Sequence, residues 1–167
     1  VVFQGTDAKW TIVSHKQNST VHAGLIAGHA TDTYIKEADI ITTDLNVDIK
    51  NDAVEGSYTS SKLYLGNLFG SYEASADNTS INDIMIMGNS GQSLKAMTTS
   101  GDAMVGGLIG YVNASNAGSL GVENVYFRVI GSESNYIAST INSKSVGNVY
   151  SGGIFGFVEG SNAIALD

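Results

Sequence analysis

Cysteine and proline are both absent from the 167 residues of this chain. Without cysteine the chain has neither a disulfide scaffold nor a thiolate metal site. Without proline every residue keeps its backbone N–H donor, as strands in the middle of a β-sheet require. The missing proline is therefore consistent with a protein built from central β-strands.

Positive charge is also scarce. Eight Lys and Arg residues stand against 16 Asp and Glu, giving a net charge of −8, and Arg128 is the only arginine. Nucleic-acid binding needs a clustered basic face, so we expect no nucleic-acid partner. No apolar run approaches the roughly 20 residues that cross a bilayer, so we also expect no membrane span.

Glycine, serine, threonine and asparagine are abundant instead, with 20 glycines in the chain. Apolar residues make up 43% and charged residues only 14%, which argues against disorder. This composition is typical of all-β repeat proteins, in which the chain bends tightly and often.

A short glycine-rich block occurs four times. Its copies are AGLIA (23–27), GNLFG (66–70), GGLIG (106–110) and GGIFG (152–156). Aligning Leu25, Leu68, Leu108 and Ile154 gives steps of 43, 40 and 46 residues. The predicted repeat residues are Gly24, Leu25, Gly66, Leu68, Gly70, Gly106, Gly107, Leu108, Gly110, Gly152, Gly153, Ile154 and Gly156.

Three further elements accompany the block. An extended lead precedes it at 19–22, 62–65, 102–105 and 148–151. A strand with period-two alternation follows it, from about Ala38, at 81–87 and at 122–130. A weaker strand occurs at 44–50, 93–99 and 136–142.

These spacings predict a right-handed parallel β-helix (β-solenoid) with about four imperfect repeats of 40–46 residues and three strands per repeat. The repeat cores lie near 19–30, 62–72, 102–112 and 148–158. We expect one segment over 1–167, cut from a longer array, with 9–13 as a remnant strand. A β-propeller and an antiparallel sandwich are the rival folds.

Glycine in the block would supply positive φ and allow close backbone approach at a bend. The Leu25 row would point into the core, and the row containing Ile26 and Phe69 would lie on the opposite face of the same strand. Both rows can be buried only if the coil is wide or another layer covers it, and the sequence leaves this open.

The blocks GGLIGYV (106–112) and GGIFGFV (152–158), with the strand at 122–132, resemble the GLUG repeat. Its Gly-Leu-any-Gly core corresponds to the sequence at 107–110. The pattern covers most of 19–160, but Ala27 replaces the closing glycine, Asn67 interrupts the second pair, and the spacing is longer than in the family. The resemblance implies a bacterial surface or secreted protein, such as an adhesin or the non-catalytic part of an immunoglobulin A-cleaving zinc metalloprotease.

No catalytic motif is present: HExxH and GxSxG are both missing, and no enzyme activity is predicted. His15, His22 and His29 are seven residues apart, which would separate them by about 20 Å along a strand. We therefore expect no metal site there. Weak candidates for calcium are Asp77, Asn78, Asn82 and Asp83, although Asp83 aligns with Glu37 and Asn124 as a structural polar position.

Tyrosines are the predicted recognition residues because they combine contact area with a hydroxyl. We expect Tyr58, Tyr64, Tyr72, Tyr111, Tyr126, Tyr136 and Tyr150 to be exposed. The variable connectors 51–61, 73–80 and 113–121 are the expected binding loops. The leading hypothesis is a non-enzymatic adhesive or structural segment, extracellular or on a cell surface, that binds a surface protein or glycan and can self-associate through its ends. A metalloprotease spacer and a carbohydrate-active β-helix enzyme are the alternatives.

Overall fold

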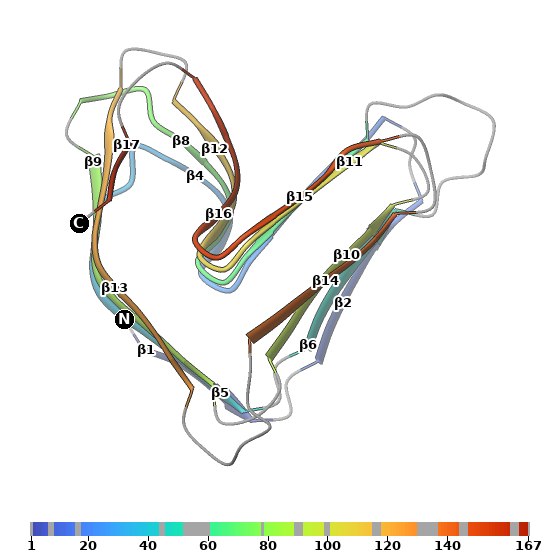
Figure 1. The fold of residues 1–167 in the computed structure, drawn as a ribbon, viewed down its shortest axis with the longest axis horizontal. Helices are drawn as coiled ribbons and strands as arrows, with labels where there is room; N and C mark the ends of the chain where they lie inside the picture. The colour runs from blue at the N-terminus through green and yellow to red at the C-terminus, as the bar shows by residue number, and fades with distance from the viewer. Residues whose placement is uncertain are drawn as a thin grey trace.

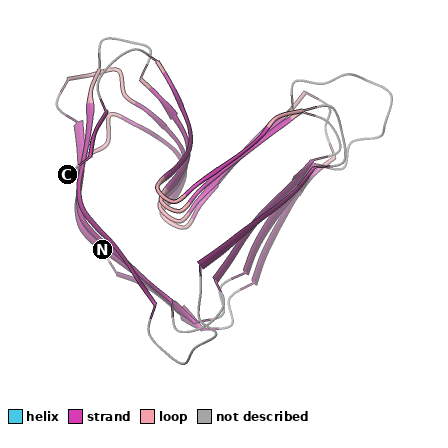
Figure 2. Cartoon of the chain, in the orientation of Figure 1, coloured by secondary structure: helices cyan, strands magenta, loops and turns pink. Residues whose placement is uncertain are grey.

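A computed structural model describes residues 2–6, 9–15, 18–43, 46–51, 61–77, 79–88, 92–98, 101–114, 118–129, 137–143, 147–160 and 164–166. These residues form 17 strands, and strands and loops alone are drawn in this part of the chain (Figure 2). The all-β prediction is thus confirmed. Nowhere in these ranges is there a helix that could cross a membrane.

The strands form four sheets, in which each strand pairs with the strand four places further along the chain. Sheet A consists of β1 (Val2–Thr6), β5 (Ile35–Thr43), β9 (Thr79–Gly88), β13 (Leu120–Val129) and β17 (Ile164–Leu166). Sheet B consists of β2 (Lys9–Ser14), β6 (Asn46–Asn51), β10 (Gln92–Thr98) and β14 (Ile137–Ser143).

The other two sheets are built from the glycine-rich blocks and their leads. Sheet C consists of β3 (Thr20–Gly24), β7 (Lys62–Gly66), β11 (Asp102–Gly106) and β15 (Val149–Gly152). Sheet D consists of β4 (Ala27–Thr31), β8 (Phe69–Glu73), β12 (Ile109–Asn113) and β16 (Phe155–Glu159). The predicted strand at 9–13, the leads and the weaker third strand are therefore all confirmed as strands.

Every pairing in the four sheets is parallel. Sandwich and propeller sheets are antiparallel, so neither rival fold fits this pairing. The prediction of three strands per repeat is wrong. Each block contains a bend that ends one strand and starts another, so each repeat contributes four strands.

In Figure 1 the strands of each sheet lie behind one another, and the chain passes through sheets A, B, C and D in turn. The outline turns sharply inward where sheet C meets sheet D. This inward bend is formed by the glycine-rich blocks, so the repeat marks one corner of the outline.

The register corrects the alignment of the first block by one residue. Gly24 pairs with Gly66, and Ala27 pairs with Phe69. Leu25 is therefore equivalent to Asn67, and Ile26 is equivalent to Leu68. The closing glycine of this block is Gly28, so the first two steps become 42 and 40 residues. The one-residue shift arises because the Ala-Gly pair at 23–24 resembles the Gly-Gly pair of the later blocks.

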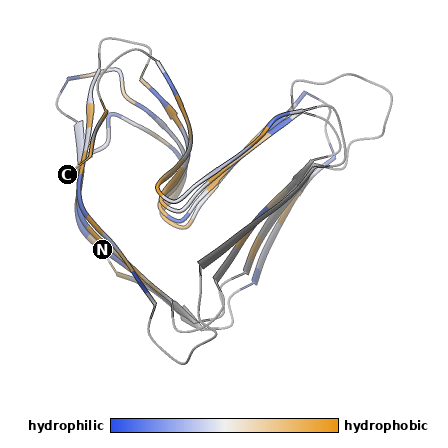
Figure 3. Cartoon of the chain, viewed as in Figure 1, coloured by the Kyte–Doolittle hydropathy of each residue, from blue (hydrophilic) through white to orange (hydrophobic). Residues whose placement is uncertain are grey.

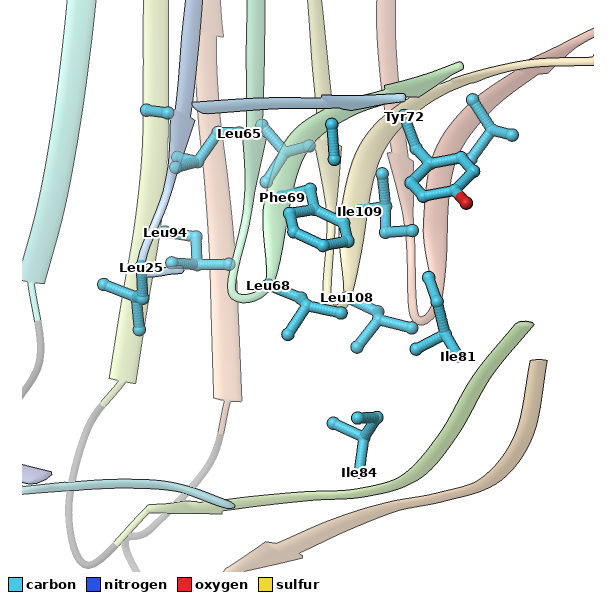
Figure 4. Packing of buried hydrophobic residues seen from close by; sticks show 14 of the residues in the cluster. Leu25, Leu65, Leu68, Phe69, Tyr72, Ile81, Ile84, Leu94, Leu108 and Ile109 are labelled. Carbon is cyan, nitrogen blue, oxygen red and sulfur yellow. The ribbon is translucent and has the colours of Figure 1, made fainter. Parts of the chain in front are cut away.

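The corner also explains how both apolar rows are buried. Leu68 and Leu108 lie at the tip of the bend, and Phe69 and Ile109 begin the next strand on its inner side (Figure 4). All four side chains are at most 1% exposed. The two rows are not opposite faces of one strand, because the bend lies between them.

The corner side chains join a core contributed by all four sheets. Figure 3 shows hydrophobic residues in orange at this corner. In Figure 4, Ile84 of sheet A faces the corner across the interior. The largest fully buried side chains include Tyr72, Phe69, Ile40, Leu63 and Leu65. At roughly 25 cal/mol for each Å² of apolar surface removed from water, such residues dominate the stability of the stack.

The block glycines other than Gly153 serve close backbone contact, and none of the block glycines has positive φ. A Cβ on Gly110 would lie 2.5 Å from the Leu65 nitrogen, and one on Gly156 would lie 2.7 Å from the Val105 nitrogen. Real Cβ atoms do not approach backbone so closely. Among the described glycines, left-handed φ occurs at Gly101 and Gly160, both outside the blocks. The glycines let sheets C and D approach each other to backbone contact.

Left-handed backbone occurs instead at one polar position of sheet A. Glu37, Asp83 and Asn124 have φ of 60°, 56° and 54°. The pairing passes over these three residues and resumes on both sides, so they are equivalent bulges. The sequence alignment of the three positions is thus confirmed, and their role there is structural.

Candidate binding surfaces

Two surfaces bring together the polar and aromatic residues that the sequence singled out. The first, which we call the C–D seam, lies on the outer side of the corner. It contains His22, Tyr64, Met104 and Tyr150 from sheet C, and His29, Ser71, Tyr111 and Phe157 from sheet D.

A histidine pair forms one end of the seam. The rings of His22 and His29 are 5.4 Å apart, and the Nδ1 atoms of both lie within 2.8 Å of the Ser71 hydroxyl. The expected separation of about 20 Å is wrong, because the bend at 25–26 folds β4 back against β3. His15 is exposed and lies before β3, outside the seam.

Burial and the neighbouring ring of His29 lower the pKa of His22. His22 is thus held in its neutral form at neutral pH. The Ser71 hydroxyl has one proton, so it can donate to one imidazole and accept from the other. The geometry satisfies all three groups and fixes two layers of the stack to each other.

An aromatic row continues the seam along the stack. Tyr64 and Tyr111 stack with ring centroids 4.7 Å apart and planes 12° from parallel, and Tyr111 stacks in turn on Phe157. The Tyr111 hydroxyl donates a hydrogen bond to Glu159. Burial, with the charges of Glu159 and Asp102, raises the pKa of Tyr64 to about 12.

The seam contains the groups of a nucleophilic site, a serine beside histidines, but a substrate has no access to the serine. A serine beside a histidine can act as a nucleophile when a substrate reaches it. Ser71 is 2% exposed and Tyr64 is 4% exposed, because residues of the neighbouring layers in sheets C and D cover both. The seam is best explained as a structural contact between sheets C and D.

The calcium candidates gain no support from the structure. Asp77 is exposed, and Asn78 lies outside the described residues. Asp83 accepts a hydrogen bond from the Asn124 amide at 3.0 Å, and Asn82 Oδ1 is buried without a partner. The described ranges contain no group of three or more His, Cys, Asp or Glu residues that could hold a metal ion.

The carboxylate of Asp32 is held in place by hydrogen bonds from the loop after β8. It accepts hydrogen bonds from the backbone N–H groups of Ser75 and Ala76 at 2.7 and 2.9 Å, and from the Ser75 hydroxyl. The Ser75 hydroxyl and these N–H groups lower the pKa of Asp32. Asp32 thus joins the loop after β4 to the loop after β8.

The second surface is the outer face of sheet A. Two adjacent rows face outward there, one containing Asp39, Met85 and Tyr126, the other Ile41, Met87 and Arg128. The inward positions between them hold Ile40 and Ile86, which are fully buried. Tyr126 is 61% exposed, Arg128 is exposed, and Met85 and Met87 are partly exposed.

The predicted recognition tyrosines divide between these environments. Tyr64 and Tyr72 are buried, at 4% and 0% exposure, so the prediction that they are exposed is wrong. Tyr126 is exposed as predicted, and Tyr111 and Tyr150 are partly exposed in the seam. Tyr58 and Tyr136 lie outside the described residues.

Sequence reasoning missed two features. Tyr34, 61% exposed just before β5, was not among the predicted recognition residues. The alternation at 81–87 predicts Met85 and Met87 only as strand residues, because period two does not say which face of a strand is outward. Of the expected binding loops, 52–60, 78 and 115–117 lie outside the described residues.

No family model matches this chain, and no curated protein or solved structure matches it either.

Proposed function

We propose that this chain is a right-handed parallel β-solenoid segment with a non-enzymatic, adhesive and structural role in an extracellular or cell-surface protein. The parallel pairing of every fourth strand supports such an architecture. The GLUG-like blocks support a bacterial surface or secreted origin. In this role the stack holds a binding face at a fixed place.

The observation that carries the adhesive role is the outer face of sheet A. It presents Tyr126, Arg128, Met85 and Met87 on two adjacent rows of a sheet whose inner side is packed core. Tyr, Met and Arg are the residue types enriched in protein interfaces. A rigid sheet also lowers the entropy cost of presenting them.

The partner class is a surface protein or a glycan of a host or neighbouring cell. Arg128 is the chain's one arginine, and it would pair with a carboxylate or sulfate on that partner. Tyr126 would supply a flat apolar surface with a hydroxyl at its edge. The connectors beside sheet A, with 73–80 among them, would extend the contact.

Binding of the purified chain to arrays of glycans and of extracellular-matrix proteins tests this role. We expect retention on some ligands, and a loss of about tenfold or more in Tyr126→Ala/Arg128→Ala, as for truncation of central interface residues. Tyr34→Ala is the matched control, since Tyr34 is equally exposed and lies outside the two rows. Equal losses in both variants would contradict the assignment of the face.

The same arrays separate binding from catalysis. Bound glycans should be recovered intact, without new reducing ends or unsaturated sugars. Release of such products would overturn the non-enzymatic role and favour a carbohydrate-active β-helix enzyme. No retention on any ligand would instead favour a passive spacer.

A further inference from the structure

The two outward rows of sheet A carry opposite charges at diagonally opposite positions. Asp39 lies on β5 and Arg128 lies on β13, with β9 between these strands. Asp39 belongs to the row of Met85, and Arg128 belongs to the row of Met87, two residues further along each strand. Two strand spacings and two residues therefore separate the charges, about 12 Å between their Cα atoms.

The positions between these charges are apolar or aromatic. Met85 and Met87 lie on the middle strand, Ile41 lies on β5, and Tyr126 lies on β13. Both methionines have a paired strand on each side, so their partial exposure is toward the side of the stack that sheet A forms in Figure 1. We call the whole set the diagonal patch: Asp39, Ile41, Met85, Met87, Tyr126 and Arg128.

A half-turn makes the diagonal patch complementary to itself. The axis lies in the plane of the sheet, midway between Met85 and Met87, and crosses the line from one charge to the other at a right angle. A second copy placed face to face by this half-turn brings its Asp39 opposite Arg128 of the first copy, and its Arg128 opposite Asp39. One pair of positions thus forms two ion pairs, as in an isologous interface.

The same half-turn matches the apolar side chains. Tyr126 of each copy comes opposite Met85 of the other, and Ile41 comes opposite Met87. On a grid of about 4.8 Å between strands and about 3.3 Å per residue, the Cα atoms of these pairs coincide in projection to within about 3 Å. Methionine adapts its shape to a facing side chain, and its sulfur packs favourably against an aromatic ring. No like charges of the diagonal patch face each other.

These charges fit a second copy better than a partner whose charge has one sign. A uniformly acidic partner would attract Arg128 but repel Asp39, and a uniformly basic partner would do the reverse. Two copies with a net charge of −8 repel each other in most orientations. The two charges of the diagonal patch cancel, so this is a surface on which two copies can approach.

We propose that the partner of the sheet A face is a second copy of this chain, bound face to face through the diagonal patch. The inference rests on the proposed adhesive role of this face, and it makes the adhesion homophilic, between copies on neighbouring cells. Because the contact is isologous, it closes at two copies.

The size of the diagonal patch predicts a weak contact for a single pair of chains. Three strands about 4.8 Å apart, over seven residues each, cover roughly 300 Å², whereas a stable interface covers about 800 Å² on each partner. Many copies held on one surface act together and raise the overall avidity. The contact is therefore best measured with many copies on each particle.

Charge exchange between two variants tests the contact. Asp39→Arg has a positive charge at both corners of the patch and Arg128→Asp has a negative charge at both, so each variant faces itself with like charges. A mixture of the two variants restores two opposite-charge contacts. Microspheres coated with the unmodified chain should aggregate, those with either variant alone should aggregate at least tenfold less, and the mixture should aggregate like the unmodified chain.

Two further variants separate position from net charge and from folding. Lys9→Asp makes the same change in net charge as Arg128→Asp, at an exposed residue of sheet B, and should leave aggregation unchanged. Asp39→Arg/Arg128→Asp on one chain restores both opposite-charge contacts and should aggregate alone. The proposal is overturned if unmodified microspheres stay dispersed, if Lys9→Asp loses as much as Arg128→Asp, or if neither the mixture nor the double variant aggregates.

The failure of the self-contact and the failure of the adhesive role are distinguishable. If the microspheres stay dispersed but an arrayed ligand is bound and then lost in Tyr126→Ala/Arg128→Ala, the face is adhesive and its partner is a different molecule. If the microspheres stay dispersed and the arrays retain nothing, the adhesive role is wrong as well.

Discussion

The C–D seam and the outer face of sheet A are built from the same kinds of residue but have different uses. Both carry tyrosines in regular rows on parallel strands. In the seam a second sheet covers the row, so Tyr64 is 4% exposed, whereas Tyr126 on sheet A is 61% exposed. The two regions differ in the glycine content of the positions next to their outward-facing rows.

Glycine at 28, 70, 110 and 156 lets sheet D approach the backbone of sheet C. Among the described residues no such row exists on sheet A, where Ile40 and Ile86 form an apolar layer inside and none of these residues covers the outer rows. The repeat alone therefore does not say whether a surface is covered by another sheet or is open to a binding partner. The residues that lie opposite the surface decide this.

The largest expected effect is at the seam glycines. Gly110→Ala places a Cβ 2.5–2.6 Å from the Leu65 nitrogen and the Gly70 oxygen, both of them backbone atoms that cannot move aside alone. We expect a loss of about 3 kcal/mol or more in the free energy of unfolding, measured by urea denaturation. Gly121→Ala in sheet A, whose nearest neighbour would be at 3.8 Å, is the control and should change it by less than about 1 kcal/mol. Similar losses in both would contradict the glycine explanation.

A large effect is also expected at the tip of the corner. Leu68→Ala should lower the free energy of unfolding by about 2–5 kcal/mol, because the side chain is fully buried between neighbouring layers. Tyr126→Ala on the open face should change it by no more than about 0.5 kcal/mol. A loss at Tyr126 as large as that at Leu68 would mean that sheet A is covered in solution.

The smallest of these effects is the pH response of the seam. His22 has a lowered pKa, so below about pH 6.5 the unfolded chain binds a proton that the folded chain does not. The contribution of His22 to the free energy of unfolding is therefore present above that pH. It is lost as the pH falls toward the pKa that His22 has in the folded chain. His22→Gln should flatten the fall in melting temperature between pH 7 and 5. An unchanged profile in His22→Gln would show that the seam histidine does not titrate on unfolding.

Much of the fold was predictable because its signals are local. Period two located the strands of sheet A, and the repeated block located the corner. The bend inside the block was not predictable, since Leu68 and Phe69 are neighbours in sequence and nothing local says that a strand ends between them. For the same reason the distance between His22 and His29 and the burial of Tyr72 were wrongly expected.

The surfaces were less predictable than the fold. Exposure depends on what lies opposite a strand, and that is set by residues about 40 positions away. The one-residue error at Leu25 shows the same limit, because only the backbone pairing of Gly24 with Gly66 distinguishes it from Ile26.

The pairing register of sheet A tests the central claim most directly. Met87 pairs with Arg128, so cysteines at these positions have Cα atoms about 4.8 Å apart, within disulfide range. Cysteines at Met85 and Arg128 are two residues out of register, about 8 Å apart on the same face. The account predicts rapid intramolecular oxidation of Met87→Cys/Arg128→Cys and little of Met85→Cys/Arg128→Cys. The reverse order, or no disulfide in either, would contradict a parallel stack with this repeat.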